Sequence, residues 1–160
     1  MNRFRLFFFP MLLLWTASIR ADWAPEVVQD SLKQMYPEAT EVAWSRDGQY
    51  YVADFMYEGF DTRVWLDDRG EWAMTQTDWQ VMDEAPGAVF DAYSMGPYAG
   101  WEVQNVTSVH FPKWAAMVAI LVGEPNLETK YQLLYTDDGR LIRARNVTNL
   151  GNVLGASTFL

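Results

Sequence analysis

The sequence predicts an α+β fold of two tandem repeats, each one helix followed by a four-stranded antiparallel meander sheet. The motif Ala-Pro-x-x-Val at residues 24–28 returns 61 residues later at 85–89. An acidic, glycine-containing turn segment at 64–72 returns 69 residues later at 133–141, so the second copy is longer in its middle. An internal repeat of this length indicates the architecture before any local pattern is considered.

Residues 1–21 are typical of a secretory signal peptide. Two arginines near the start precede an apolar run at 6–15, and small residues follow at Ser18 and Ala21. This is the order of features that export signals share. The alternative is a membrane anchor, but the run is shorter than the roughly 20 apolar residues that a spanning helix needs. We therefore expect a periplasmic or secreted protein, cleaved after Ser18 or Ala21, with no membrane insertion of the mature chain.

The first repeat, residues 22–77, is expected to begin with a helix. Val28, Leu32 and Met35 recur on one helical face. Pro25 suits the first turn, where a missing N–H costs nothing, and Pro37 ends the helix. Four strands are predicted after it, separated by turns that each contain a glycine, at 40–44, 49–56, 61–66 and 71–77.

A linker at 78–84 leads to the second repeat, residues 85–147, which follows the same plan. Its helix spans 87–95 and is closed by a Gly-Pro pair. The uncharged tail at 148–160 allows two interpretations, a frayed end or a segment that docks on the body. The strands of this repeat are predicted at 101–110, 113–122, 127–135 and 140–145.

Strand alternation assigns side chains to the two faces of each sheet. Thr62, Val64 and Leu66 share one face, and Tyr131, Leu133 and Tyr135 are their equivalents in the second repeat. We expect these residues to pack under the helices. The opposite face should then be open, with Trp65 exposed on it. The candidate binding residues on that open face are Tyr50, Asp54, Arg63 and Trp65.

Composition and charge narrow the classes of partner. Half of the 160 residues are hydrophobic, which is ample for a packed core, and no cysteine is present to form a disulfide. Without residues 1–21 the chain keeps nine basic and 21 acidic residues, a net charge of −12. Such a chain should not bind nucleic acid through phosphate contacts, and anionic membrane surfaces should repel it. Proteins, cationic ligands or neutral glycans are the expected partners.

No pattern of catalytic residues is visible, so we expect no enzyme activity, cofactor or metal. His110 is the only histidine, which leaves no histidine cluster for a metal and no triad with a nucleophile. The acidic pairs at 67–68 and 137–138 lack the alternating acidic positions of a calcium loop and are interpreted as hairpin turns.

One set of residues carries a family pattern through its order and spacing, namely Ala24, Pro25, Val28, Tyr36, Pro37, Ala39, Trp44, Tyr51, Phe55, Trp65, Asp67, Gly70 and Trp72. This pattern resembles the secreted PepSY-like proteins, also called beta-lactamase-inhibitor-like. The resemblance covers about residues 22–147 and implies tandem α/β repeats in an exported bacterial protein with a non-enzymatic binding role. Two features depart from the pattern: the second repeat is longer, and Leu141 stands where the first repeat has Trp72.

From these observations we predict an exported, non-enzymatic binding protein. An open sheet face that carries Trp, Tyr and Arg has the composition of a protein-binding hot spot, and inhibition of a secreted enzyme is one version of this role. The alternative is a module that binds cell-envelope glycans or small ligands through stacked aromatic rings. Strong salt dependence of binding would favour a protein partner, and binding that is insensitive to salt would favour the alternative.

Overall fold

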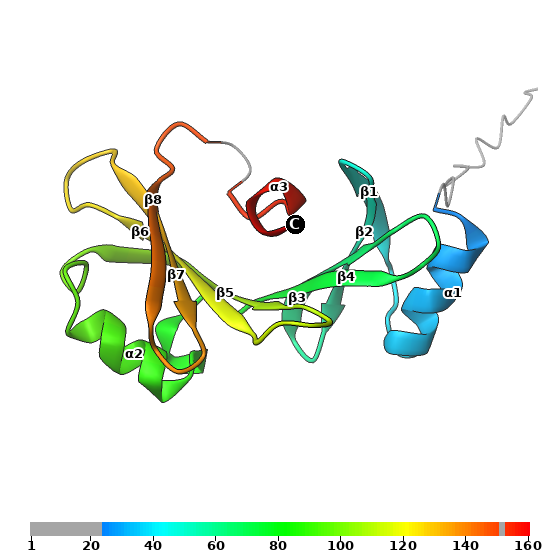
Figure 1. Cartoon of the computed structure of the whole chain (residues 1–160), viewed down its shortest axis with the longest axis horizontal. Coiled ribbons are helices and arrows are strands. Elements are labelled where there is room, and N and C mark those ends of the chain that lie inside the picture. The colour runs from blue at the N-terminus through cyan, green and yellow to red at the C-terminus, as the bar shows by residue number, and fades with distance from the viewer. Residues whose placement is uncertain (1–23, 151–152) are drawn as a thin grey trace, which may run out of the picture.

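The computed structural model describes residues 24–150 and 153–160, so the predicted signal peptide lies outside the described residues. Eight strands dominate the described chain, and short helices precede, divide and follow them (Figure 1). In chain order the elements are α1 (Glu26–Met35), β1 (Ala43–Asp47), β2 (Tyr50–Tyr57), β3 (Phe60–Leu66), β4 (Trp72–Asp78), the 3-10 helix η1 (Met82–Glu84), α2 (Gly87–Ser94), β5 (Glu102–His110), β6 (Met117–Gly123), β7 (Lys130–Thr136), β8 (Leu141–Asn146) and α3 (Ala156–Phe159).

All eight strands belong to one antiparallel sheet in which each strand pairs with its sequence neighbours. The prediction of two tandem repeats, each with a separate four-stranded sheet, is therefore wrong. The sheet continues through β4 and β5, which pair from Thr75 opposite His110 to Asp78 opposite Thr107. The fold is a single meander sheet with short helices, and it is mostly β rather than α+β.

The physical reason for this continuity is the cost of strand edges. Two separate four-stranded sheets have four edges with unpaired N–H and C=O groups, whereas one eight-stranded sheet has two. Pairing of β4 with β5 removes the two inner edges, and the Asn105 amide adds a hydrogen bond to the Asp78 carboxylate at 2.9 Å. Turn patterns locate strands along the chain but do not show that two of them pair across a linker.

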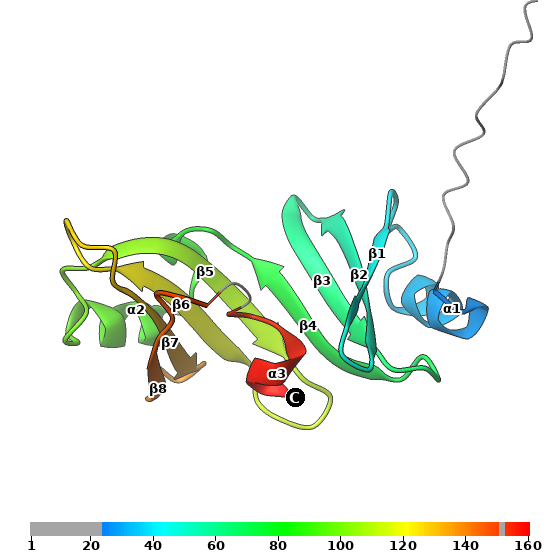
Figure 2. The ribbon, with the colours of Figure 1, turned by 90° about the horizontal axis from the view of Figure 1, so that it is seen from above.

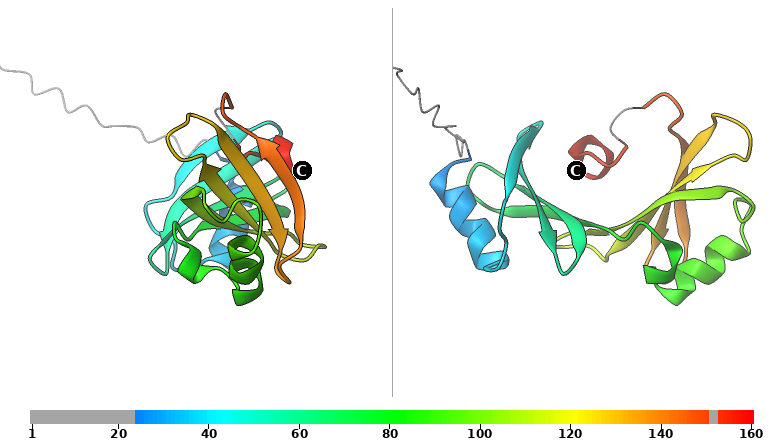
Figure 3. Two further views of the ribbon diagram at one scale, coloured as in Figure 1. Left: turned by 90° about the vertical axis from the view of Figure 1, so that its left-hand side faces the viewer. Right: turned by 180° about the vertical axis from the view of Figure 1, so that it is seen from behind.

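The sheet is curved, and the helices lie on opposite sides of it. Helices α1 and α2 pack on the outer, convex face near the two ends of the sheet, and α3 lies inside the curve (Figures 1 and 3). Val28 and Leu32 of α1 are buried against β2 and β3, and Val89 and Tyr93 of α2 are buried against β5, β6 and β7. Each helix therefore completes a core with strands that follow it closely in the chain.

The predicted assignment of side chains to the convex face is confirmed. Val64 and Leu66 are buried under α1, and Leu133 and Tyr135 are buried under α2. Full burial of an apolar side chain of this size stabilises a fold by about 1.5–3 kcal/mol. A shift of one residue in register would have moved all four to the other face.

The bounds of the elements differ from the predicted ones mainly at the starts of β1, β6 and β7, and the strand predicted at 127–135 begins at Lys130. The predicted strand at 40–44 begins at Ala43, because Glu41 has a φ of +54°, which places it in a turn rather than in a strand. The predicted strand at 113–122 begins at Met117, after the exposed turn that carries Trp114. Helix α1 spans Glu26–Met35 and ends directly before Tyr36 and Pro37, as predicted.

Two glycine turns lie against the two helices. Gly70 and Gly139 have φ angles of +78° and +86°, which favour glycine because it has no Cβ. A Cβ on Gly139 would lie 2.3 Å from the Ala88 carbonyl oxygen of α2, and one on Gly70 would lie 2.3 Å from Ser31 Oγ of α1. Glycine is therefore required both by the turn and by the approach of the helix.

The end of the chain docks on the inner, concave face of the sheet. Residues 153–160 cross the middle of this face, and α3 lies beside β5 in the view from above (Figure 2). Ala156 is buried there, and Leu154 and Phe159 pack on the same apolar cluster. Of the two interpretations that the sequence left open for the tail, the docked one holds for these residues.

Candidate binding surface on the concave face

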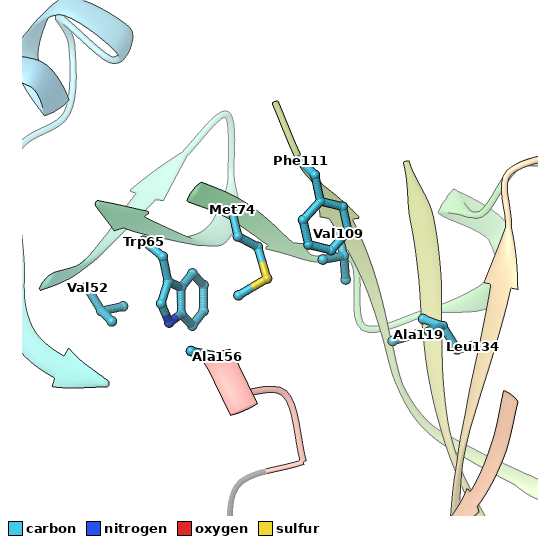
Figure 4. Close-up of a cluster of buried hydrophobic side chains, with 8 residues drawn as sticks. All are labelled: Val52, Trp65, Met74, Val109, Phe111, Ala119, Leu134 and Ala156. Atoms are coloured by element: carbon cyan, nitrogen blue, oxygen red, sulfur yellow. The ribbon is translucent and has the colours of Figure 1, made fainter. Parts of the chain in front are cut away.

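A third apolar cluster spans the concave face at the middle of the sheet. Figure 4 shows Trp65 of β3 and Met74 of β4 beside Ala156 of α3, with Val109 and Phe111 from the end of β5 next to them. Trp65 has 2 % of its surface exposed, and Met74 has none. The cluster draws on both halves of the sheet and is covered by the C-terminal segment, residues 153–160.

Two glutamines hold the main chain at the start of the C-terminal segment. Gln76 on β4 donates from Nε2 to the Leu154 carbonyl oxygen at 2.6 Å. Gln132 on β7 donates from Nε2 to the Val153 carbonyl oxygen. Both side chains have 1 % of their surface exposed. A buried amide is costly unless it is hydrogen-bonded, so these two residues stabilise the docked segment and are themselves stabilised by it.

An aspartate and an arginine hold the rest of the segment. Asp47 Oδ2 accepts a hydrogen bond from the Ala156 N–H at 2.6 Å and one from the Trp65 indole N–H at 3.0 Å. Arg143 on β8 donates from Nη1 to the Thr158 carbonyl oxygen at 3.3 Å. All four contacts from the strands are made to main-chain atoms of the segment.

The rim of the concave face on β2 and β3 is exposed and acidic. Asp54 pairs with Arg63 across the two strands, and Met56 pairs with Asp61. Asp54 and Asp61 are exposed, and Met56 has 57 % of its surface exposed. Within the described residues the only ion pair joins Lys33 to Asp30, so neither rim aspartate has a cation within 4 Å.

Burial raises the pKa of the Asp54 carboxyl above its ordinary value of 3.8. The positive charge of Arg63 partly offsets this effect, and the negative charge of Asp61 adds to it. The direction shows that Asp54 is less well solvated than a free carboxylate and that Arg63 does not fully compensate it. A cation brought to this rim would find a carboxylate whose negative charge Arg63 only partly offsets.

The four predicted binding residues lie on one face, but they do not form one open surface. Asp54 and Arg63 are neighbours on the rim, and Tyr50 is half-buried against the apolar cluster. The expectation that Trp65 is exposed is wrong, because residues 153–160 cover it. Its ring also lies 5.7 Å from the Arg63 guanidinium, so Trp65 supports the rim from below.

Sequence reasoning missed the side chains that bind the segment, namely Asp47, Gln76, Gln132 and Arg143. One signal was available for the two glutamines. Alternation places Gln132 on the same strand face as Leu134, and a polar amide next to apolar neighbours indicates a buried hydrogen bond. Nothing local could identify the partner atoms, because Gln76 and Leu154 are 78 residues apart.

A separate groove of about 620 Å³ lies on the convex face over the middle of the sheet. Its floor carries hydroxyl groups of β3, β4 and β5, where Thr62 pairs with Thr77 and Thr77 pairs with Ser108. Trp72 at its edge donates from Nε1 to Thr75 Oγ1 at 2.9 Å. The aromatic residues that line the groove are Tyr36, Tyr57, Phe60, Trp72, Trp79 and His110.

Two further findings concern the described residues as a whole. They contain no group of three or more acidic, histidine or cysteine side chains placed to hold a metal ion. None of the helices within the described ranges is long and apolar enough to cross a membrane.

The fold is similar to solved structures of proteins from Bacteroides, although no protein-family model and no curated protein matches the sequence. A DUF2874 family protein from Bacteroides uniformis is 59% identical with a TM-score of 0.85, and the match covers 86% of this chain and 100% of that one. A candidate periplasmic protein from Bacteroides eggerthii is 55% identical with a TM-score of 0.84, over 86% and 99% of the two chains.

A BLIP-like protein from Bacteroides fragilis is 32% identical with a TM-score of 0.74, and the match covers 80% of this chain and 89% of that one. This similarity places the chain among proteins of the BLIP-like fold. Within that class, the chain belongs to the DUF2874 family. The beta-lactamase-inhibitor-like part of the resemblance seen in the sequence agrees with these structures, whereas the PepSY-like name receives no support from them.

Proposed function

We propose that this chain is an exported, non-enzymatic protein-binding module whose partner docks on the concave face. The single observation that carries the proposal is the exposed rim of Asp54, Met56 and Asp61, which borders a buried aromatic cluster and has no ion pair of its own. Exposed apolar atoms next to acidic groups without an ion pair are suited to a partner that presents a basic residue inside an apolar patch. Export is supported by the predicted signal and by the candidate periplasmic relative.

Inhibition of a secreted enzyme is the more specific form of this proposal. It is supported by the BLIP-like relative, which shares 32% of its aligned residues with this chain. A curved sheet can cover a convex protein surface without rearrangement of its backbone, and rigid interfaces of this kind lose little entropy on binding. The acidic net charge would also speed the approach of a basic partner.

The test is a comparison of two double variants that change net charge equally. The mature chain and its Asp54→Asn/Asp61→Asn variant are used to capture envelope proteins, and any captured protein is then titrated at two salt concentrations. We expect the rim variant to bind roughly tenfold more weakly and with a smaller salt dependence. The control, Asp68→Asn/Asp137→Asn, changes two exposed turn residues outside the rim and should leave binding unchanged. Equal effects of the two variants would contradict the proposal.

The convex groove supports a second candidate function, the binding of a neutral glycan. Its hydroxyl floor and aromatic wall are the two elements that sugar recognition uses, and its volume of about 620 Å³ lies within the range of ligand sites. Trp79→Ala would remove one wall without touching the concave face. Binding of cell-wall oligosaccharides that is lost in Trp79→Ala and retained in Asp54→Asn would favour this candidate.

A further inference from the structure

The concave face already holds a peptide, which is the C-terminal segment of the chain itself. Asp47, Gln76, Gln132 and Arg143 come from four different strands, and each contacts a main-chain atom of residues 153–158. Recognition of the main chain depends little on side-chain identity, so the same four groups can hold any segment with the same path. The four side chains thus contact the main chain of this segment as a binding site contacts a bound peptide.

The side chains of the segment define what the groove selects. Ala156 is buried over Trp65, where a larger residue would not fit without rearrangement. Phe159 lies 6.2 Å from the Phe111 ring and 5.9 Å from the Arg143 guanidinium. Residues 153–160 carry no charged side chain. The groove therefore suits an uncharged segment with a small residue followed, three positions later, by an aromatic one.

The docked segment does not provide a hydrogen-bond partner for every buried polar atom of the concave face. Gln76 Oε1, Thr107 Oγ1 and Arg143 Nε are buried and have no hydrogen-bond partner within the described protein. Gln76 and Thr107 each have 1 % of their surface exposed. Buried polar atoms without partners are uncommon, and each one favours a ligand that can pair with it. A foreign segment that hydrogen-bonds to these atoms would make contacts that the chain's own segment does not make.

We propose that residues 153–160 are an intramolecular ligand, and that an uncharged segment of the partner replaces them in the concave groove. This inference rests on the proposed function, because both place the partner on the same face. Attachment to the body gives the C-terminal segment an effective concentration of the order of millimolar. A segment of the partner can replace residues 153–160 only if its affinity for the concave face is high enough to compete at this effective concentration. The C-terminal segment therefore sets the lowest affinity at which a partner can bind there.

The test uses the full mature chain and a fluorescein-labelled octapeptide, Val-Leu-Gly-Ala-Ser-Thr-Phe-Leu. Ala156→Asp places a carboxylate beside Asp47 and should drive the segment out of the groove. Fluorescence anisotropy should then show binding of the peptide at least tenfold tighter than to the wild-type chain. The matched control is Ser157→Asp at the exposed neighbouring position, which should exclude the peptide as the wild type does. No binding to folded Ala156→Asp, or equal binding to all three chains, would overturn the inference.

A second variant covers the case in which Ala156→Asp does not fold. A protease recognition sequence inserted between Leu150 and Val153 allows the segment to be cut from the folded chain. We expect the cut chain to stay folded and to exchange its segment for the labelled peptide within hours. Unfolding on cleavage, or retention of the original segment, would show that residues 153–160 are a permanent part of the core.

The peptide assay and the capture assay fail independently. The peptide assay needs no partner and depends on the groove, whereas the capture assay depends on the acidic rim. If the peptide binds but the rim variant captures proteins normally, the inference stands and the proposed rim is wrong. If a captured partner binds Ala156→Asp and the wild type equally well, the partner does not displace the segment and the inference fails.

Discussion

The two faces of the sheet are covered in different ways. On the convex face, each cluster is closed by a helix that lies just before its strands in the chain, as α1 does for β2 and β3. On the concave face, the cover comes from the far end of the chain, and Asp47 and Ala156 are 109 residues apart. The convex cores are local units, whereas the concave core forms only when both ends of the chain are in place.

This difference bears on function as well as on stability. A helix that lies close in sequence to the strands on which it packs can form this contact early and at low entropic cost, because the loop that must close is short. A segment that comes from a distant part of the chain closes a long loop. This one is held by four side-chain contacts to its main chain and by the packing of Leu154, Ala156 and Phe159 on the apolar cluster. We therefore expect the C-terminal segment to open at a lower cost than the helices of the convex face, which would make an exchange of segments feasible there.

The largest expected effect is that of Trp65→Ala on the concave face. Removal of a buried indole should lower the free energy of unfolding by about 3–5 kcal/mol, as measured by urea denaturation. The control is Trp114→Ala, because Trp114 has 62 % of its surface exposed, and its loss should cost about 1 kcal/mol or less. Equal losses for the two variants would mean that the C-terminal segment does not bury Trp65 in solution.

Leu133→Ala on the convex face should cost slightly less, about 2–5 kcal/mol, because the side chain is fully buried under α2. Leu127→Ala removes the same atoms from a residue that is 61 % exposed, so it should change the unfolding free energy by about 0.5 kcal/mol or less. If deletion of residues 153–160 left the Leu133→Ala loss unchanged while abolishing the Trp65→Ala loss, the two faces would be energetically independent.

Gly139→Ala tests the contact between a turn and its helix. The substitution should cost about 1–2 kcal/mol for the left-handed backbone, with roughly 1–3 kcal/mol more for the contact with the Ala88 carbonyl. Gly48 has a φ of +60° and no neighbouring atom within 4 Å of its absent Cβ, so Gly48→Ala should carry only the backbone cost. Thermal unfolding of the two variants separates the backbone cost from the cost of the contact with α2. Equal losses of stability in the two variants would show that α2 can move away from the turn.

The convex face could be predicted from the sequence because its signals are local. Helical spacing at Val28 and Leu32 and strand alternation at Val64 and Leu133 place these residues correctly. Each pattern reflects a periodic backbone and a single buried side, so a short stretch of chain contains all the information.

The concave face could not be predicted in the same way. Alternation places Trp65, Asp54 and Arg63 on one face, but it does not show whether that face meets water or another segment. The pairing of β4 with β5 and the docking of Ala156 are long-range contacts that leave no periodic trace. The uncharged tail was the only sign that something could cover the face, and an uncharged tail is equally consistent with a frayed end.

The smallest expected effect concerns the rim, where the concave face meets solvent. Because burial raises the pKa of the Asp54 carboxyl, the folded chain binds a proton there more readily than the unfolded chain. Stability from this group is therefore fully present below the ordinary pKa of 3.8 and is lost as the pH rises through the raised value. Asp54→Asn should increase the free energy of unfolding at pH 7 by about 0.5 kcal/mol or less, since the group is exposed.

The pH dependence of this gain is the sharper measurement. At pH 3 the carboxyl is mostly protonated in both states, so the difference in melting temperature between Asp54→Asn and the wild type should shrink towards zero. The Arg63→Gln background removes the charge that partly offsets the effect, so the gain at pH 7 should be larger there. A gain that is equal at both pH values, or that is unaffected by Arg63, would mean that the rim is as well solvated as any other surface. The Asp54 carboxylate would then lose no more hydration in the folded chain than other surface carboxylates do, and its burial would not favour a cationic partner.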